Sequence, residues 1–175
     1  MNPEAYEAYL RGRYYLSNQF TMAQPLNAAR SYFEESIQKD PGFALAYSGL
    51  ADSYAYLGVF RQLSPDGAYR PAKEALRKAL ELDDSIGEAH DTLGLLSWTY
   101  EWDWDAAERE LNRAIALAPS YSCAHEDRSI YLGFTGRRAE ALAEIAKSSR
   151  VGSWSQLRDG RIGDVLSAAR LRRFG

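Results

Sequence analysis

The sequence predicts an all-α protein, a solenoid of about four helix-turn-helix repeats followed by a C-terminal helix. Two observations support this. Segments beginning at Ala46, Ala89 and Ala124 resemble one another, and each is followed by a second helical pattern. In that second pattern, an alanine precedes a bulky apolar residue by four positions and a small residue by seven. Such spacing marks one face of an α-helix, and small residues on it allow close helix packing.

The second pattern recurs along the chain and defines the second helix of each repeat. In two cases a turn with a proline, Pro41 or Pro119, follows it. Since proline cannot continue a helix interior, these turns close their repeats. The alanines are Ala29, Ala72, Ala107 and Ala141, the bulky residues are Phe33, Leu76, Leu111 and Ile145, and the small residues are Ser36, Ala79, Ala114 and Ser148.

The spacing from each second helix to the next first helix is constant, whereas the spacing from first to second helix within a repeat varies. From the alanine of each second helix to the small residue of the next first helix, the distance is always 22 positions. From first to second helix within a repeat, it is 17, 21, 13 and 12 positions. All length variation therefore falls in one kind of turn, which lies on one edge of a solenoid. The small residues of the first helices are Gly12, Ala51, Gly94 and Ser129.

These features resemble the tetratricopeptide repeat (TPR) family, whose unit of about 34 residues has small and apolar residues at fixed offsets and a late proline. The family's first-helix tyrosine is matched by Tyr15 and Tyr54. The long first turns and the segment Trp102–Asp105 look like arrays attached to bacterial signalling proteins. The resemblance covers about Ala5 to Ser149. It implies a right-handed superhelix whose first helices line the inner, concave surface.

The expected organisation is a TPR array over residues 1–149, with repeats at about 5–41, 44–84, 87–119 and 122–149. Residues 150–175 are expected to form an irregular segment and a short basic helix, because apolar residues from Ile162 to Ala169 follow helical spacing. A terminal repeat needs a cap with a polar outer face. There are two alternatives to such a cap. The segment is either a basic tail that docks elsewhere or binds an acidic partner, or a truncated fifth repeat.

The composition limits the function classes. The 175 residues are 46% hydrophobic and 26% charged, with a net charge of −3, so a basic nucleic-acid-binding face is not expected. From Lys147 onward, seven basic and two acidic residues give an acidic body with a basic tail. No 18-residue apolar stretch is present and the N-terminus does not read as a secretory signal, so no membrane contact and a cytoplasmic location are expected.

The residues that commonly carry chemistry are sparse. His90 and His125 occupy the same position in successive repeats, which favours packing at a helix interface. Cys123 and His125 are two positions apart, so they cannot converge on one metal ion from a helix. The sequence also lacks the glycine-rich phosphate loops. We therefore expect no enzyme activity, no cofactor and no metal.

TPR proteins commonly hold peptides on the concave surface, and the resemblance places binding residues there. Several of the corresponding side chains are aromatic and four are acidic, so we expect a groove for a basic or mixed segment with apolar anchors. The alternative is that the acids form a solvated face and the aromatic rings pack between helices. The candidate residues are Tyr6, Tyr9, Arg13, Ser48, Asp52, Tyr56, Glu88, Asp91, Leu95, Trp98, Glu126 and Ile130.

The function predicted on this basis is a protein-interaction scaffold or sensor module that binds a peptide or protein segment. A second surface, the insertion edge, carries aromatic residues such as Phe20, Phe60 and Trp102. The alternative function is a structural unit that self-associates by end-to-end stacking, since an open apolar end of a solenoid invites such contact.

Overall fold

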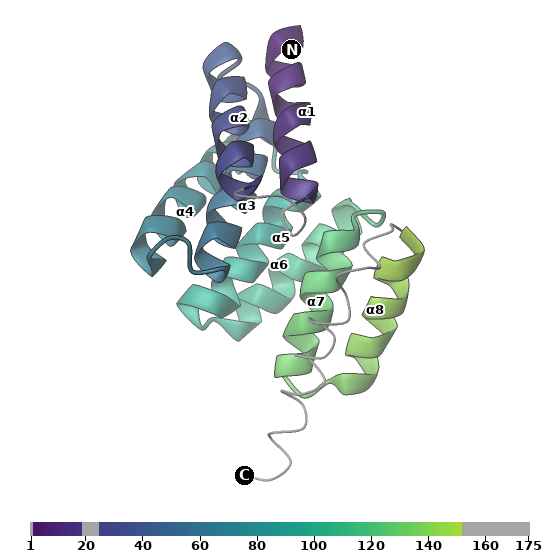
Figure 1. Ribbon diagram of the computed structural model, residues 1–175. Helices are drawn as coiled ribbons and strands as arrows, with labels where there is room; N and C mark the ends of the chain where they lie inside the picture. Colours follow the sequence, from purple (N-terminus) through teal and green to yellow (C-terminus); the bar gives the residue numbers. More distant parts are fainter. Residues whose placement is uncertain (1, 19–24, 152–175) are drawn as a thin grey trace.

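The computed structural model describes residues 2–18 and 25–151, with side chains up to Ser148. Its secondary structure over these ranges is entirely helical, as the sequence predicts (Figure 1). The expected capping helix within 150–175 falls outside the described residues, as does Phe20. The helices are α1 (Pro3–Ser17), α2 (Pro25–Lys39), α3 (Ala44–Val59), α4 (Pro65–Leu82), α5 (Gly87–Leu96), a π-helical turn η1 (Ser97–Glu101), α6 (Trp104–Leu117), α7 (Ser122–Phe134) and α8 (Arg138–Val151).

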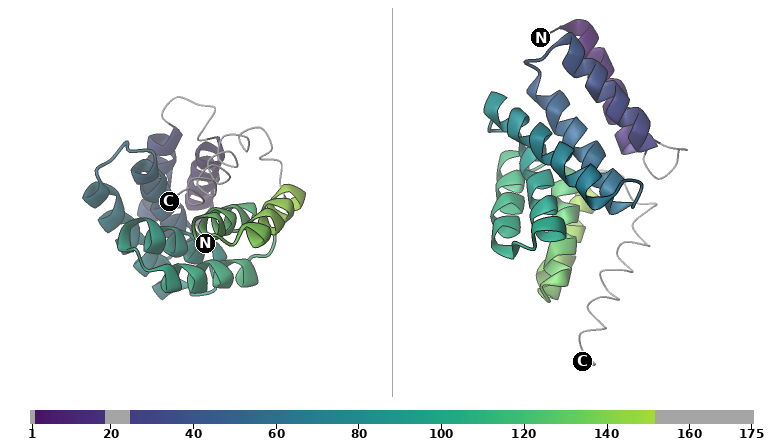
Figure 2. Two further views of the ribbon diagram at one scale, coloured as in Figure 1. Left: turned by 90° about the horizontal axis from the view of Figure 1, so that it is seen from below. Right: turned by 90° about the vertical axis from the view of Figure 1, so that its left-hand side faces the viewer.

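The helices pair in chain order into four hairpins, α1 with α2, α3 with α4, α5 with α6 and α7 with α8. Figures 1 and 2 show these hairpins following one another in a curved array, with α1 at one end and α8 at the other. The first helices also contact one another, α1 with α3, α3 with α5 and α5 with α7. Each hairpin thus buries its apolar face against its neighbours, as a solenoid requires.

The core is built by the residues of the repeated pattern. Ala29, Ala72 and Ala107 are fully buried, and so are the bulky residues four positions after them. The ring of Phe33 lies between two glycines of neighbouring helices, Gly12 on α1 and Gly49 on α3. A Cβ added at Gly12 would lie 2.7 Å from that ring, and one at Gly49 would lie closer still. These glycines are therefore required for three helices to meet at Phe33.

The two histidines form equivalent contacts in successive repeats. His90 Nδ1 lies 2.6 Å from Glu110 Oε2, and His90 Nε2 lies 3.0 Å from the carbonyl oxygen of Asp84. His125 Nδ1 lies 2.6 Å from Glu144 Oε2, and its Nε2 lies 3.1 Å from the carbonyl oxygen six residues earlier. Both histidines are buried. Each one joins the start of a first helix to the second helix of its own repeat, which confirms the packing interpretation.

Glu144 is the more enclosed of the two glutamate partners. Its side chain also accepts from Arg128 at 2.6 Å and from Lys147 at 2.8 Å. Burial would raise the pKa of Glu144, but the hydrogen bonds from Lys147 and His125 outweigh it and hold that pKa below its usual value. The two helices of the last hairpin are therefore held together by a charged network around Glu144. The two helices of the first hairpin instead pack around the apolar ring of Phe33.

The turn between α5 and α6 places its two tryptophans differently. After η1, Trp102 adopts a left-handed conformation (φ 58°), and Asp103 caps α6 by accepting from the backbone N–H of Ala106 at 2.8 Å. Trp104 packs inward with its ring centroid 6.2 Å from that of Trp98, while Trp102 remains 70% exposed. In this turn, therefore, one tryptophan packs against its neighbours and the other remains exposed.

No helix among the described residues is long and apolar enough to cross a membrane.

Candidate functional site

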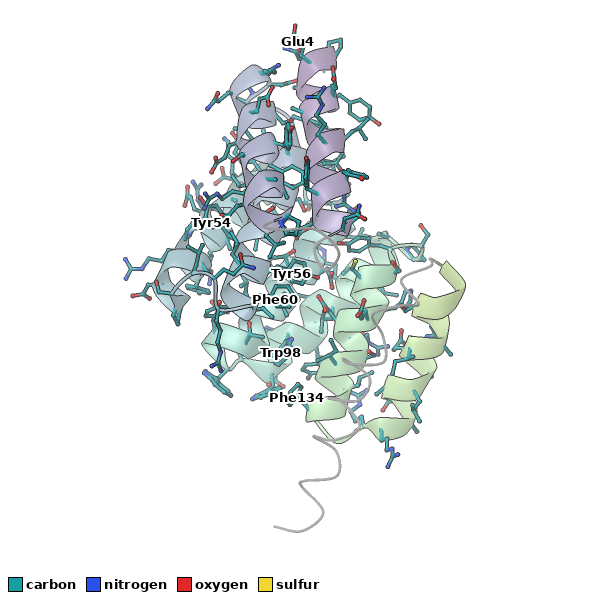
Figure 3. All side chains as sticks on the ribbon, viewed as in Figure 1. Glu4, Tyr54, Tyr56, Phe60, Trp98 and Phe134 are labelled. Carbon is teal, nitrogen blue, oxygen red and sulfur yellow. The ribbon has the colours of Figure 1, made fainter. Side chains whose placement is uncertain are left out.

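The concave face of the array is formed by α1, α3, α5 with η1, and α7, because the first helix of each hairpin contacts the first helix of the next. Aromatic side chains run along it. Tyr56 stacks on Phe60 with centroids 6.2 Å apart, and Trp98 lies 5.2 Å from the ring of Phe134. Figure 3 shows these four rings one below another, from α3 through η1 to α7. The face therefore carries two aromatic pairs, Tyr56 with Phe60 and Trp98 with Phe134.

The predicted groove residues differ widely in exposure. Tyr6 is the exposed one, at 41%, near the open end of α1. Tyr9, Arg13, Glu88, Trp98, Glu126 and Ile130 are partly buried, whereas Ser48, Asp52, Tyr56, Asp91 and Leu95 are buried.

Two of the acidic residues lie deep in the face rather than on a solvated surface. Asp52 on α3 is 2% exposed and Asp91 on α5 is 3% exposed. Thr92 Oγ1 on α5 donates a hydrogen bond to Asp52 Oδ1 where α3 packs on α5, and the charge of Asp52 contributes to the raised pKa of Asp91. The interpretation of these two acids as a solvated face is therefore wrong. The sequence pattern alone did not reveal how deeply the curved array encloses them.

The charge of this cluster is only partly balanced. Arg13 Nη1 lies 4.0 Å from Asp52 Oδ2, a distance that permits an ion pair but not a hydrogen bond. Burial raises the pKa of Asp52 to about 7, although Arg13 opposes this. Burial, and then the carboxylates of Asp127 and Asp52, raises the pKa of Asp91 well above its usual value. The cluster therefore retains protons at a pH where an exposed aspartate has lost them.

Several polar atoms on this face are buried without a hydrogen-bond partner. Among the described residues, five buried side-chain N or O atoms lack one, and four belong to predicted groove residues. The fifth is Arg30 Nε, on α2. Because buried polar groups in folded proteins almost always have partners, a concentration of such atoms on one face indicates that ordered water or a ligand supplies them. The four groove atoms are Ser48 Oγ, Asp52 Oδ2, Asp91 Oδ1 and Trp98 Nε1.

Arg13 also connects the first repeat to the fourth. Its guanidinium carbon lies 5.8 Å from the ring centroid of Tyr121, at the start of α7, within the range of a cation–π contact. A cavity of about 140 Å³ lies at this junction, lined by residues that include Arg13, Tyr56, Tyr121 and Cys123. Repeats far apart in the sequence thus meet across the concave face.

Tyr121 and Asp127 were not predicted as site residues. Tyr121 lies in the turn before α7, and only the curvature of the array brings it opposite Arg13. Asp127 is buried at 3% exposure, and its charge raises the pKa of Asp91. Its position next to Glu126, a predicted groove residue, was the available signal.

In the described part of the chain, no group of three or more His, Cys, Asp or Glu side chains is arranged to hold a metal ion.

No protein-family model and no curated protein matches the chain. Solved structures do match it. A thermophilic TPR protein from Thermus thermophilus is 21% identical with a TM-score of 0.67, and the match covers 95% of this chain and 81% of that protein. A structure of MamA is 20% identical with a TM-score of 0.53, covering 99% of this chain and 86% of its own. At these identities the likeness shows the fold, which is TPR-like.

Proposed function

We propose that this TPR-like array is a protein-interaction module, and not an enzyme, that binds a peptide or protein segment along its concave face. The observation that supports the proposal most directly is the combination of two aromatic pairs with buried, unpartnered polar atoms on that same face. Aromatic side chains supply large apolar contact area at low entropic cost. Polar atoms that lack partners gain them when an extended backbone or a side chain enters.

The charge of the face indicates the chemistry of the partner. Asp52 and Asp91 are buried there. Two further acidic residues of this face are partly buried, Glu88 on α5 and Glu126 on α7. Arg13 is the cation that faces Asp52. Complementary charge orients a partner and speeds its encounter. A basic or mixed segment with apolar anchors therefore fits the groove better than an acidic one.

The long turns after the first helices support a further proposal, that the module belongs with arrays that accompany bacterial signalling proteins.

End-to-end self-assembly is the second candidate function, and it has its own observation. Tyr6, Leu10 and Tyr14 lie one turn apart along α1 and are 41%, 48% and 56% exposed. They form an apolar stripe on the first helix of the array, where a preceding repeat or a second copy would pack. Solution mass across a concentration series separates this function from peptide binding, since only self-assembly makes the mass rise with concentration.

The proposed function is tested by capturing partners from a lysate of the cells that make the protein. The groove variant carries Asp52→Asn, Glu88→Gln and Asp91→Asn, which remove charge while keeping side-chain size. Lysine at the two buried positions would place a cation in the core and disturb folding. We expect a partner held by the wild-type chain to be lost by this variant, because the three side chains can no longer ionise to pair with a basic segment.

The control variant removes three charges from exposed positions on the outer helix α4, through Asp66→Asn, Glu74→Gln and Glu81→Gln. It is expected to retain the partner. Circular dichroism of both variants establishes that they are folded. Equal retention by the folded groove variant and the control would show that the concave face is not the binding surface.

A further inference from the structure

Acidic side chains from three successive first helices lie on the concave face. Glu88 and Asp91, three positions apart, share a side of α5, and Thr92 of that helix is hydrogen bonded to Asp52 on α3. Glu126 lies on α7, which packs against α5. Burial is the main cause that raises the pKa of Asp91, and the charges of the other three carboxylates each raise it further, so they lie near it. The face therefore gathers carboxyl groups from α3, α5 and α7.

A face that combines carboxylates with aromatic rings suits arginine in particular. A guanidinium forms planar, paired hydrogen bonds with a carboxylate and also stacks on aromatic rings, whereas the lysine ammonium is a compact point charge. Arg13 already shows both contacts, since it lies 4.0 Å from Asp52 Oδ2 and 5.8 Å from the ring centroid of Tyr121. The two aromatic pairs of the face offer further surface for apolar residues. A fitting ligand therefore carries arginines next to apolar side chains.

Residues 165–174 of this same chain have that composition. They include three arginines and no acidic residue. The positive charge after α8 is concentrated in this segment, because the two arginines among residues 152–164 are balanced by two aspartates. The arginines of the segment are Arg170, Arg172 and Arg173, and the apolar residues beside them are Leu171 and Phe174.

The place where α8 ends brings this segment within reach of the concave face. α7 and α8 run antiparallel, and the contact between His125 and Glu144 places the last turns of α8 beside the start of α7 (Figure 1). Tyr121, at that start, lines the cavity on the concave face together with Arg13. Residues 152–164 span up to about 40 Å when extended, whereas four first helices spaced about 8–10 Å apart cover only about 30 Å.

We propose that residues 165–174 dock in the concave groove of their own chain and that a partner has to displace them. This inference rests on the proposed function of the groove, because it names the occupant of the groove in the absence of a partner. A segment tethered to the same chain has an effective concentration of about 1 mM. A dissociation constant of about 0.1 mM therefore suffices to keep the groove occupied for about nine-tenths of the time.

The position of the segment is tested by photo-crosslinking in the purified full chain, at high dilution and without a partner. Benzoylphenylalanine replaces Ile130, which is partly buried on α7, and in a control chain it replaces Trp102, which is 70% exposed at the insertion edge. We expect position 130, and not position 102, to be crosslinked to residues 165–174 in a product with the mass of one chain. The crosslinked peptides are identified by mass spectrometry.

Three results of this experiment would overturn the inference. The first is the absence of any crosslink between position 130 and the segment. The second is a crosslink to the segment from position 102 alone, which would place the segment at the insertion edge. The third is a product with the mass of two chains and no product of one, which would mean that the segment docks on a second copy.

The competition that the inference implies is tested with a fluorescein-labelled peptide of residues 165–175 as the probe. A variant with all three segment arginines changed to glutamate is expected to bind this peptide about tenfold more tightly than the wild-type chain, because its own segment no longer competes. Fluorescence anisotropy measures both affinities. The substitutions are Arg170→Glu, Arg172→Glu and Arg173→Glu.

A matched control variant makes the same change in net charge at three exposed arginines of the outer helices α4 and α6, and it is expected to bind the peptide as the wild-type chain does. Equal affinities of the segment variant and the control, or no binding of the peptide to either, would refute the docked segment. Circular dichroism establishes that both variants are folded. The control substitutions are Arg70→Glu, Arg109→Glu and Arg113→Glu.

The outcomes separate this inference from the proposed function, because neither experiment uses the natural partner. If the groove captures a partner and position 130 is not crosslinked to the segment, the groove function stands and the docked segment is wrong. If the segment is crosslinked from position 130 and no partner is lost by the groove variant, the docked segment stands and the proposed function of the groove is wrong.

Discussion

A Phe33→Ala variant is expected to lose about 3–5 kcal/mol of unfolding free energy, the usual range for removing a fully buried phenylalanine. Phe33 is 0% exposed and its ring fills the space above Gly12 and Gly49. Neither glycine has a side chain that can move into the cavity left behind. Urea denaturation followed by circular dichroism measures the loss as a lower transition midpoint with an unchanged slope.

The same contact supplies a control for this prediction. Gly49→Ala is expected to destabilise the wild-type chain, since the added Cβ would overlap the Phe33 ring, and to be much less harmful when Phe33 is already alanine. Tyr14→Ala on the exposed side of α1, where the side chain is 56% exposed, should change stability by less than about 0.5 kcal/mol. Additive effects of Gly49→Ala and Phe33→Ala would mean that these residues do not meet in the core.

An Asp52→Asn variant is expected to be more stable than the wild-type chain at about pH 8, and nearly equal to it at about pH 4. The folded-state pKa of Asp52 is about 7, whereas an unfolded aspartate titrates near about 4. Between these values the folded state holds the extra proton, so wild-type stability falls as the pH rises through this window. A displacement of about three units corresponds to at most about 4 kcal/mol.

Asparagine avoids this penalty because it is neutral at every pH and still accepts the hydrogen bond from Thr92. The measurement is the difference in unfolding free energy between variant and wild type across the pH range. Asp66→Asn, at an exposed position on α4, is the control for the aspartate-to-asparagine replacement itself. Destabilisation by Asp52→Asn of the same size at both pH values would show that the buried carboxylate is paired well enough to remain ionised.

The repeat architecture was predictable because it depends on local spacing. The alanine at each marker position, such as Ala29 or Ala107, has to be small where two helices touch, and the bulky residue one turn later has to fill the gap beside it. Both constraints act within a few residues and recur in every hairpin. The sequence therefore indicates which helices pair and which edge holds the long turns.

The depth of the groove was not predictable in the same way. Whether Asp52 and Asp91 meet water depends on how strongly successive hairpins rotate, and that rotation is set by many contacts at once. The approach of Arg13, in the first repeat, to Tyr121, in the turn before the fourth, results from the accumulated curvature. The partners of the two histidines were also not predicted. Glu110 and Glu144 each lie three residues after a marker alanine, but the positions of His90 and His125 did not indicate that these glutamates would contact them.

The central claim is that the concave face holds the partner, and site-specific photo-crosslinking tests it most directly. One chain carries benzoylphenylalanine in place of Ile130, which is partly buried on α7, and another carries it in place of Trp102, which is 70% exposed at the insertion edge. We predict that the captured partner is crosslinked from position 130 and not from position 102. Crosslinking from position 102 alone would contradict the claim and place the binding surface at the insertion edge.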